Sequence, residues 1–441
     1  MQLNYLLLGI GLLGSAPLYG SDPFFDLDKE MAVYQQPSLQ SQSLESEFKR
    51  YIRDQEKAYK NWLSQYLKEF DQFQNELVNK WGEGDVSQKQ RSVEFSDDKN
   101  VKSVIDYENE QVTVALLVDK SLSEMDAKQA VRLKVDQLLA DKKSNLARLF
   151  DDNQLVTTAH ISMSDVRYSN KKKQQLKERI IEQTQAQVQE IDKQADRAQL
   201  PDSLLTERES RLLSTQAKKQ LLASSKRRLS AANEQYDQAR ERAEQDKKIV
   251  LYTVTLAKHL LAKRAAKYAS FAERESQNFA VPAALVMAIM HSESAFDPLA
   301  KSAVPAYGLM QIVPTTAGHD VNKLLRNIDR PMDKKDLYIA AINIETGSAY
   351  LSILDKRYLR AITDKRSRLY CTIASYNTGA GNVARAFNEN GSRNIRQAAI
   401  VINKLSATAV YERLMVKLPY DETKHYLQRV YSRIALYQTP S

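Results

Sequence analysis

The sequence predicts a mainly helical protein of α+β class that is divided into several domains. Gly (12) and Pro (11) are sparse for a chain of 441 residues, which disfavours a turn-rich all-β architecture. Long stretches also place apolar residues at helical spacing. The chain is longer than one ordinary hydrophobic core supports, so we expect two or three domains.

Residues 1–20 have the features of an export signal. An apolar stretch runs from Tyr5 to Leu13 and is followed by small residues and Pro17. Such a stretch is too short to span a bilayer comfortably and is typical of a signal peptide. We therefore expect residues 1–20 to be a signal peptide that is cleaved after Gly20. No Cys follows the apolar stretch, so we expect no lipid anchor at a lipobox cysteine.

Residues 21–165 are expected to form a small α+β domain. Aromatic residues recur at helical spacing over Leu44–Trp81, which predicts an amphipathic helix or pair of helices whose aromatic stripe packs in a core. Apolar and polar residues alternate over Val101–Val118 around a turn at Glu108-Asn109, which predicts a β-hairpin. A helix over Met125–Leu149 is expected to pack on this hairpin.

Residues 166–248 are rich in Gln, Lys, Arg, Glu and Ala and predict a helical hairpin. Pro201 is expected to end the first helix, because proline disrupts a helix interior. A dimerising coiled coil is the alternative. Seven-residue spacings predict which residues are buried between the two helices: Ile181, Thr184, Val188, Ile191, Ala195 and Ala198 in the first, and Leu222, Leu229, Ala232, Tyr236, Ala239 and Ala243 in the second.

Residues 249–441 are expected to form a helical domain, entered through a strand or extended linker at Ile249–Leu256. Residues from Ala262 to Ser441 include 25 Lys and Arg against 15 Asp and Glu, so this stretch accounts for the net charge of +9. A basic domain favours an anionic partner, which could be nucleic acid, a membrane surface or an acidic polymer. The basic residues are dispersed and no nucleic-acid-binding motif occurs, so we expect no nucleic-acid partner.

Glu293 is the candidate catalytic residue of this domain. Pro282 suits the first position of a helix that ends near Ser294. Val286, Ile289 and Met290 precede Glu293 by seven, four and three residues, so all four side chains share one helix face. If that face packs in the core, desolvation raises the pKa of the carboxyl group, by up to ~3 to 5 units in buried cases. A Glu that is protonated at neutral pH can donate a proton to the leaving group when a glycosidic bond is cleaved.

Three further residues are candidates for substrate binding. Gln311 follows Gly308-Leu309-Met310 and offers an amide donor and acceptor to a ligand. Tyr376 and Asn377 end an apolar helix just before Gly379 and Gly381. An aromatic ring beside an amide at a Gly-rich turn suits an uncharged sugar, because the ring can lie against the sugar and the amide can bind its hydroxyl or N-acetyl group.

The order and spacing of these motifs resemble family 1 lytic transglycosylases over about residues 252–437. The motifs that carry the resemblance are ES at Glu293-Ser294, GLMQ at Gly308–Gln311, NIETGSAYL at Asn343–Leu351, YN at Tyr376-Asn377 and YLQRV at Tyr426–Val430. Residues 21–165 also resemble, less specifically, the N-terminal domain of one member of that family. The helical hairpin has no counterpart in the resemblance, and we expect it to be a spacer or a handle for another cell-wall protein.

The resemblance implies a lysozyme-like helical catalytic domain in a periplasmic enzyme. It implies cleavage of the β-1,4 bond between N-acetylmuramic acid and N-acetylglucosamine in peptidoglycan, with 1,6-anhydromuramyl products. Glu293 would be the single acid/base. Ser294 would support the Glu or the substrate, Gln311, Tyr376 and Asn377 would line the subsites, and Tyr426 would help orient the intermediate. The missing lipobox cysteine leaves open only a peripheral association with the membrane.

Two other functions remain open on the sequence. A hydrolytic muramidase would cleave the same bond but would need a second carboxylate. A non-catalytic peptidoglycan-binding scaffold would use the coiled coil to recruit partners.

The remaining reactive residues predict no further chemistry. The five His have no metal-binding spacing, so we expect no metal and no cofactor. His291 is expected to be exposed or hydrogen-bonded on another helix face. The lone Cys371 is expected to be a buried structural thiol. Asp297, which precedes Pro298, is expected to be a loop or cap residue.

Overall fold

The computed structural model describes residues 63–150, 159–200, 206–242, 246–256, 259–302 and 304–438. The chain divides into two units, Met1–Phe70 and Asp71–Ser441. In the first unit, the described residues 63–70 are helical. The predicted signal peptide and residues 44–62 of the predicted aromatic helix lie outside the described residues. Every element discussed below belongs to the second unit, in which residues 71–81 are helical.

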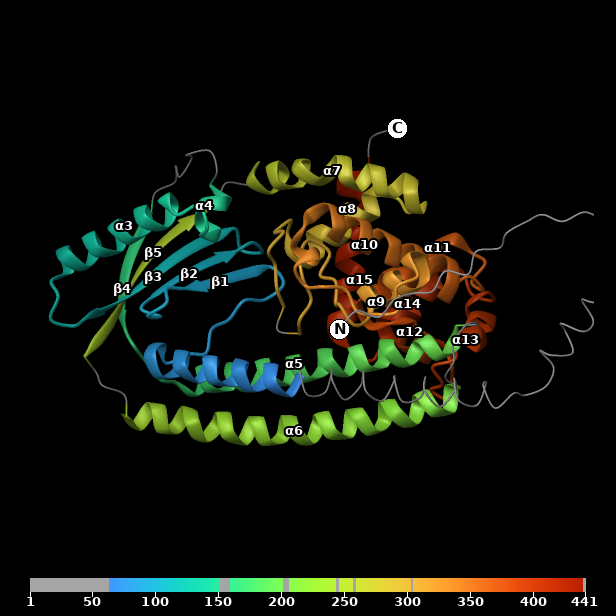
Figure 1. The fold of residues 1–441 in the computed structure, drawn as a ribbon, viewed down its shortest axis with the longest axis horizontal. Helices are drawn as coiled ribbons and strands as arrows, with labels where there is room; N and C mark the ends of the chain where they lie inside the picture. The colour runs from blue at the N-terminus through green and yellow to red at the C-terminus, as the bar shows by residue number, and fades with distance from the viewer. Residues whose placement is uncertain are drawn as a thin grey trace, which may run out of the picture. The chain divides into compact units, whose positions relative to one another are not determined.

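A five-stranded antiparallel sheet forms the centre of the small domain, in the order β1-β2-β3-β5-β4 (Figure 1). The predicted hairpin is confirmed as the pair β2–β3, in which Val101 lies opposite Leu116. The strands are β1 (Arg91–Phe95), β2 (Val101–Asp106), β3 (Gln111–Asp119), β4 (His160–Asp165) and β5 (Lys247–Thr255).

Two helices, and not the single helix expected over Met125–Leu149, pack on this sheet. α3 (Glu124–Ala140) lies along one face of it, and α4 (Asn145–Leu149) follows (Figure 1). The prediction of one continuous helix is wrong because Asp141 takes an extended conformation. Ser144 then starts a new helix, in which its side chain accepts a hydrogen bond from the Ala147 amide.

The strand β5 corrects the domain boundary that the sequence suggested. The run Ile249–Leu256 does form a strand, but β5 pairs with β3 on one side and β4 on the other. It therefore belongs to the sheet of the small domain and not to the C-terminal helical domain. The helical hairpin is consequently an insertion between two neighbouring strands of one sheet.

The hairpin consists of α5 (Asn170–Asp196), η1 (Arg197–Gln199) and α6 (Glu207–Arg242). The two helices lie side by side, and the Thr184 hydroxyl donates a hydrogen bond to Ser225 Oγ at 2.8 Å (Figure 1). The heptad assignment is partly wrong, because Ile181 and Leu222 are 41% and 50% exposed. The buried stripe of α5 is displaced by one residue and includes Ile180.

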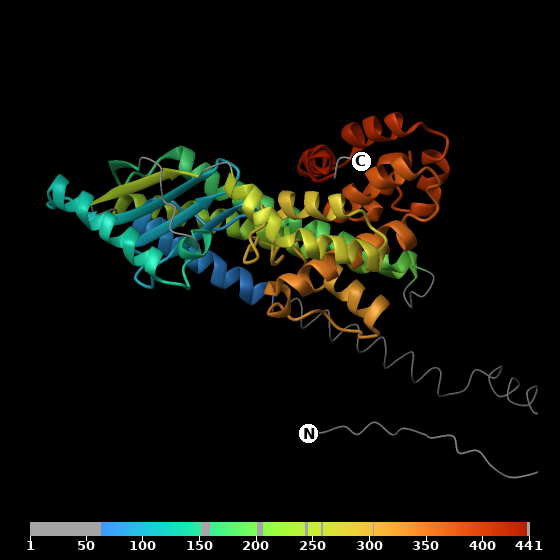
Figure 2. The ribbon, with the colours of Figure 1, turned by 90° about the horizontal axis from the view of Figure 1, so that it is seen from above.

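The C-terminal domain is helical and has one large hydrophobic core. Figure 2 shows its helices from a second direction. Among the described residues, no helix is both long and apolar enough to cross a membrane. The predicted class, a mainly helical protein with a small α+β domain, is confirmed. The helical elements are α7 (His259–Phe279), α8 (Ala283–Ser294), α9 (Ala317–Arg326), η2 (Asp336–Tyr338), α10 (Ala340–Ile353), η3 (Leu354–Tyr358), α11 (Lys365–Thr378), α12 (Ala380–Phe387), α13 (Ile395–Ile402), α14 (Ala407–Lys417), α15 (Asp421–Ile434) and η4 (Ala435–Tyr437).

Asp85 is a buried carboxylate that joins the start of the sheet to the hairpin. Its two oxygens accept hydrogen bonds from Arg91 at 2.6 and 2.7 Å, and Arg179 of α5 and Lys102 of β2 lie at 3.1 and 3.4 Å. Burial opposes the negative charge, but the three cations hold the pKa of Asp85 well below its usual value. The carboxylate is therefore ionised at neutral pH and fixes the direction in which the chain enters β1.

Replacement of this carboxylate is expected to be strongly destabilising. Asp85→Asn keeps the side-chain volume but leaves three cations without their anion, which we expect to cost about 3–5 kcal/mol of unfolding free energy. Urea unfolding of the variant and of the wild type measures this loss. Asp165→Asn is the matched control, because Asp165 is 51% exposed in its ion pair with Lys120 and its loss should cost less than about 1 kcal/mol. Equal losses in the two variants would contradict the role given to Asp85.

Candidate functional site

The helix α8 carries Glu293 into the core of the C-terminal domain. Its N-cap is Pro282 and its first helical residue is Ala283, one position after the predicted start, and every residue from Leu285 to Ser294 is buried. Glu293 itself is only 3% exposed. The helix ends at Ala295, which adopts the left-handed conformation with φ of 47°. The carboxylate therefore lies inside the domain and not on a frayed helix end.

A buried asparagine, Asn343, anchors the loop Gly308–Gln311 beside Glu293. Asn343 belongs to a motif in the sequence analysis, which assigned it no role. Asn343, on α10, accepts a hydrogen bond from the Met310 amide at 2.8 Å. Its own amide donates to the carbonyl oxygens of Tyr307 and Leu337 at 2.8 and 2.7 Å. Gly308 has φ of +74°, and a Cβ there would lie 2.4 Å from the Leu337 oxygen, so this position requires glycine.

Ser294 connects α8 to this loop. Its hydroxyl oxygen lies 2.8 Å from the carbonyl oxygen of Leu309 and 3.1 Å from that of Met290, and its side chain is fully buried. The hydroxyl group is thus used within the protein. Of the two predicted roles, support of the helix that carries Glu293 fits this position better than contact with a substrate.

Gln311 has one free hydrogen-bonding atom in a buried position. Its Nε2 donates to the carbonyl oxygens of Ala300 and Gly308 at 3.0 and 2.9 Å. Its Oε1 is buried and has no partner among the described residues. A buried acceptor without a donor is unfavourable unless a ligand or water satisfies it. This oxygen is suited to bind an N–H or O–H group of a substrate.

Tyr376 and Asn377 lie at the end of α11, close to α15. The Tyr376 hydroxyl donates to the Met310 carbonyl oxygen at 2.8 Å, so this ring also holds the loop. Asn377 donates from its amide to Glu422 at 3.1 Å and accepts from the Thr423 hydroxyl at 2.7 Å. Neither side chain is free, and Asn377 is oriented by two residues that the sequence analysis did not single out.

Tyr426 lies on α15 and interacts electrostatically with Glu293. It is fully buried, and its hydroxyl oxygen has no well-formed hydrogen bond to a described residue. Burial and the neighbouring Glu293 carboxylate raise the pKa of Tyr426 well above its usual value. The phenol is therefore a neutral potential donor facing Glu293.

Lys89 and Glu422 complete the charges around Glu293, and sequence reasoning missed both. Lys89 Nζ lies 3.1 Å from Glu293 Oε2 and 3.2 Å from Glu422 Oε1. Glu422 could have been found, because it stands four residues before Tyr426 and so shares its helix face. Nothing in the local sequence pattern points to Lys89, which lies about 200 residues before Glu293 in the small domain.

Comparison with known proteins finds a family model that matches part of the C-terminal domain. Residues 270–399 match the family model described as "Transglycosylase SLT domain". Over these residues the C-terminal domain is similar to transglycosylase SLT domains, and it is called the SLT domain below. The part of the chain that matches includes Glu293, Gln311, Tyr376 and Asn377, whereas Tyr426, Glu422 and Lys89 lie outside it.

Two curated relatives carry the name "Membrane-bound lytic murein transglycosylase C". The protein from Serratia proteamaculans is 40% identical over 183 residues, which cover 41% of this chain and 50% of the relative. The protein from Photorhabdus laumondii is 42% identical over 178 residues, covering 40% and 48%. The resemblance inferred from the sequence, to lytic transglycosylases and among them to transglycosylase C, is confirmed. The chain spans about half the length of these relatives.

Two solved structures show a partial likeness to the chain. The lytic transglycosylase Slt of Pseudomonas aeruginosa, solved as an inactive mutant, is 28% identical, covering 38% of this chain and 23% of that one with a TM-score of 0.29. The 70 kDa soluble lytic transglycosylase of Escherichia coli is also 28% identical, covering 38% and 24% with a TM-score of 0.30.

The Gly-rich turn that follows Tyr376 and Asn377 contacts the helical hairpin. The Gly381 amide donates to Asp196 Oδ2 of α5 at 2.8 Å. A Cβ at Gly379 would lie 2.8 Å from Lys193, and one at Gly381 would lie 2.1 Å from Asp196. Glycine at these two positions therefore permits the close approach of the hairpin, and the predicted contact of Tyr376 and Asn377 with a sugar stays a prediction.

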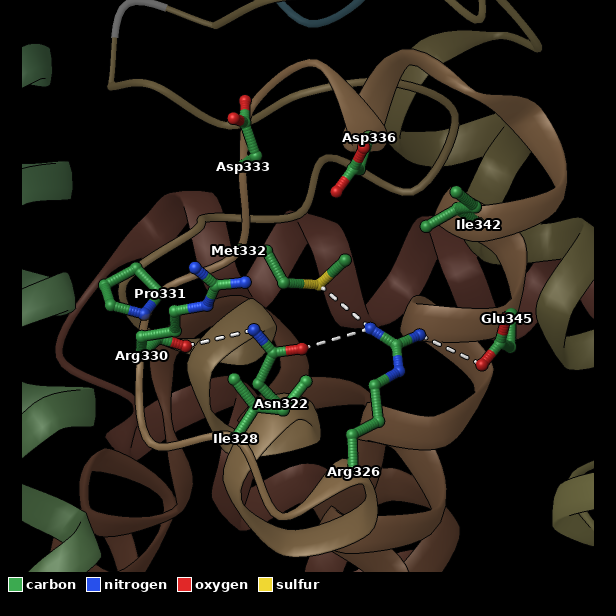
Figure 3. Close-up of a pocket in the computed structure, with 10 residues that line it drawn as sticks. All are labelled: Asn322, Arg326, Ile328, Arg330, Pro331, Met332, Asp333, Asp336, Ile342 and Glu345. Atoms are coloured by element: carbon green, nitrogen blue, oxygen red, sulfur yellow. Dashed lines mark hydrogen bonds and ion pairs between the residues drawn. The ribbon is translucent and has the colours of Figure 1, made fainter. Parts of the chain in front are cut away.

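A cavity of about 630 Å³ lies elsewhere in the SLT domain (Figure 3). It is lined by residues of α9, α10 and the segment between them, and none of the six predicted site residues takes part. Its Arg326 pairs with Glu345 at 2.9 Å and with Asn322 at 3.2 Å, so its polar groups largely satisfy one another. Within the described ranges no cluster of His, Cys, Asp and Glu is arranged to hold a metal ion. The predicted absence of a metal and of a cofactor stays a prediction.

The three residues that were given ordinary structural roles have them. Cys371 is fully buried, and burial raises the pKa of its thiol. Asp297 accepts a hydrogen bond from the Leu299 amide at 2.9 Å, as a loop residue does. His291 is 8% exposed, and its Nδ1 lies 2.9 Å from the Tyr437 hydroxyl, so of the two expected states the hydrogen-bonded one is correct.

The buried His291 is expected to make stability depend on pH. Burial, together with the nearby charges of Arg433 and Arg264, lowers the pKa of His291 from 6.5 to about 4. Between these two values the unfolded chain binds the proton and the folded chain does not, so stability falls as pH drops from 6.5 towards 4. The loss should reach at most about 3 kcal/mol.

Chemical unfolding at pH 7 and at pH 4.5 measures this dependence. In His291→Gln, which has no titrating group, the difference in unfolding free energy between the two pH values should shrink by about 2 kcal/mol. An unchanged difference would show that His291 is charged in the folded state.

Proposed function

We propose that this chain is a lytic transglycosylase that cleaves the β-1,4 bond between N-acetylmuramic acid and N-acetylglucosamine in peptidoglycan. The proposal is carried by one observation: Glu293 is a buried carboxylate at the end of a core helix within a transglycosylase SLT domain. The printed names of the curated relatives support murein as the substrate class. An exported, periplasmic location would give the enzyme access to this polymer.

Glu293 acts twice in the proposed reaction. It first donates its proton to the glycosidic oxygen, so that the bond from the muramic C1 atom to this oxygen breaks. The resulting carboxylate then accepts the proton of the muramic C6 hydroxyl as that oxygen bonds to C1. The product is a 1,6-anhydromuramyl end, no water is consumed, and the same carboxyl group is protonated again at the end.

The neighbouring residues support this chemistry in separate ways. Gln311 Oε1 is a buried acceptor without a partner and is available to a substrate N–H or O–H group. Tyr426 is a neutral phenol beside the acid and is available to the developing charge. Ser294, Tyr376 and Asn343 hold α8 and the loop Gly308–Gln311 at fixed distances. Asn377 completes the predicted subsite once its bond to Glu422 is exchanged for one to the sugar.

Removal of the acid should abolish turnover without abolishing binding. We expect Glu293→Gln to lower the release of muropeptides from isolated sacculi by about 10²- to 10⁴-fold, the usual contribution of a general acid. Sedimentation with sacculi should remain as in the wild type, because the side-chain volume is kept. Turnover equal to that of the wild type would leave only the scaffold function that the sequence left open.

A hydrolytic muramidase is the second candidate, and Glu422 is the observation that favours it. Glu422 and Glu293 both lie within 3.2 Å of Lys89 Nζ, so the two carboxylates are close enough to form a hydrolase pair. A hydrolase would use Glu422 as nucleophile or base. A lytic transglycosylase would use it only to orient Asn377.

The products and one substitution separate these two candidates. Mass spectrometry of digested sacculi should find muropeptides lighter by one water than the hydrolytic products. Glu422→Gln should lower the rate by less than about 10²-fold and leave the product unchanged, because the attacking oxygen comes from the sugar. Hydrolytic products, together with a loss in Glu422→Gln as large as in Glu293→Gln, would establish the muramidase instead.

A further inference from the structure

We propose that Lys89 of the small domain is a positioning residue of the SLT site, which holds Glu293 in an ion pair until substrate displaces the lysine. This inference rests on the proposed function, because it assigns a control to the same acid. It starts from the two ion pairs of Lys89, with Glu293 at 3.1 Å and with Glu422 at 3.2 Å.

Lys89 reaches the site on a tight turn formed by residues 88–91, here called the β-turn finger. Gln88 and Arg91 exchange backbone hydrogen bonds of 2.8 and 3.1 Å, which close the turn. Arg91 is fixed in turn by its two hydrogen bonds to the buried Asp85. The finger is therefore a braced element, and its tip residues Lys89 and Gln90 are the ones that enter the SLT domain.

Gln90 attaches the finger to the helix that carries the acid. Its Nε2 donates to the carbonyl oxygens of His291 and Ser292 at 2.9 and 3.0 Å. These two carbonyl groups belong to the last turn of α8, immediately before Glu293. The backbone oxygen of Gln90 accepts from the Tyr107 amide at 3.0 Å. Both side chains at the tip of the finger thus bind at or beside residue 293.

The ammonium of Lys89 is permanently charged in this position. Burial opposes the charge, but the carboxylates of Glu293 and Glu422 raise the pKa of Lys89 well above its usual value. Its side chain is 36% exposed, so a ligand that enters the site can reach and displace it. The ammonium also lies 5.7 Å from the centre of the Tyr426 ring, which holds it over the same face of the site.

Apart from the Glu422 carboxylate, which shares the ammonium, the other groups around Glu293 are neutral or bonded elsewhere. The two neighbouring phenols are neutral, because burial and the Glu293 charge raise their pKa values well above the usual range. His291 is neutral above about pH 4. Arg433 bonds to Ser292 Oγ and to the His291 carbonyl oxygen at the helix end. Among the described residues, the titratable and charged groups around Glu293 and the end of α8 are Lys89, Tyr376, Glu422, Tyr426 and Arg433. His291 is adjacent on α8 itself.

A cation at ion-pair distance favours the carboxylate form of an acid. The first step of the proposed reaction needs the protonated form, which the ion pair with Lys89 disfavours. In the second step the carboxylate accepts a proton, which the same cation would also oppose. Displacement of Lys89 by the sugar would therefore couple substrate binding to uptake of the proton by Glu293.

Removal of the ammonium should extend activity to higher pH. In Lys89→Met the descending alkaline limb of the rate of muropeptide release should move upward by about 1–2 pH units, because the acid keeps its proton longer. At one pH unit above the wild-type midpoint this corresponds to an increase of about tenfold. Lys89→Arg keeps the charge and should keep the wild-type limb. Lys120→Met removes an exposed lysine of the same domain that pairs with Asp165, and it should leave the profile unchanged.

A second variant tests the finger without removing the charge. Gln90→Ala loses both hydrogen bonds to α8 and should move the limb in the same direction by a smaller amount. The proposal would be overturned if the alkaline limb of the pH–rate profile of Lys89→Met coincided with that of the wild type. Equal loss of activity at every pH, or a rise in KM with an unmoved limb, would also overturn it, because these results indicate a structural or a substrate-binding lysine.

The same digests keep this inference separate from the proposed function. The identity of the products tests whether the chain is a lytic transglycosylase. The position of the alkaline limb tests Lys89, and it can be read from any muropeptide that is released. Anhydro products with an unmoved limb would remove the inference alone.

Discussion

A carboxylate inside a protein core must be neutralised by a proton or by a cation, and the construction around Glu293 follows from this requirement. The helix α8 is buried on all sides, so it brings the acid out of water, but it offers no partner of its own. The partner comes from a different domain, through Lys89. The approach of the β-turn finger therefore supplies the cation that the buried acid is paired with.

The same requirement explains how the hairpin is attached. α5 buries Asp192 and Asp196, which both pair with Arg393 of the SLT domain, and Glu190, which accepts a hydrogen bond from the Thr316 hydroxyl. An interface made of paired charges resembles those between parts of a chain that can separate. Because α5 and α6 are inserted between β4 and β5, the hairpin, the sheet and the finger are mechanically one assembly.

The parts of the structure that could be predicted from sequence are those set by local pattern. The spacing of Val286, Ile289, Met290 and Glu293 placed the acid at the core, because a helix fixes which side chains share a face. The heptad pattern failed at Ile181 because α5 packs against two neighbours, α6 and the SLT domain, so its buried surface includes polar residues such as Gln187. Lys89 was unpredictable because ion pairs between domains leave no periodic signal.

The order of the two proton transfers explains why the contact between Lys89 and Glu293 would affect the reaction. One carboxyl group that serves first as acid and then as base must pass through both charge states in every cycle. A site that stabilised only the neutral form would hold its proton too tightly to donate it, although its carboxylate would accept the C6 proton readily. A cation that leaves when the sugar enters would let the carboxyl group pass through both states, and its return after product release would restore the ion pair. The exposed side of Lys89 and the second carboxylate of Glu422, which can hold the displaced ammonium nearby, provide the means for such an exchange.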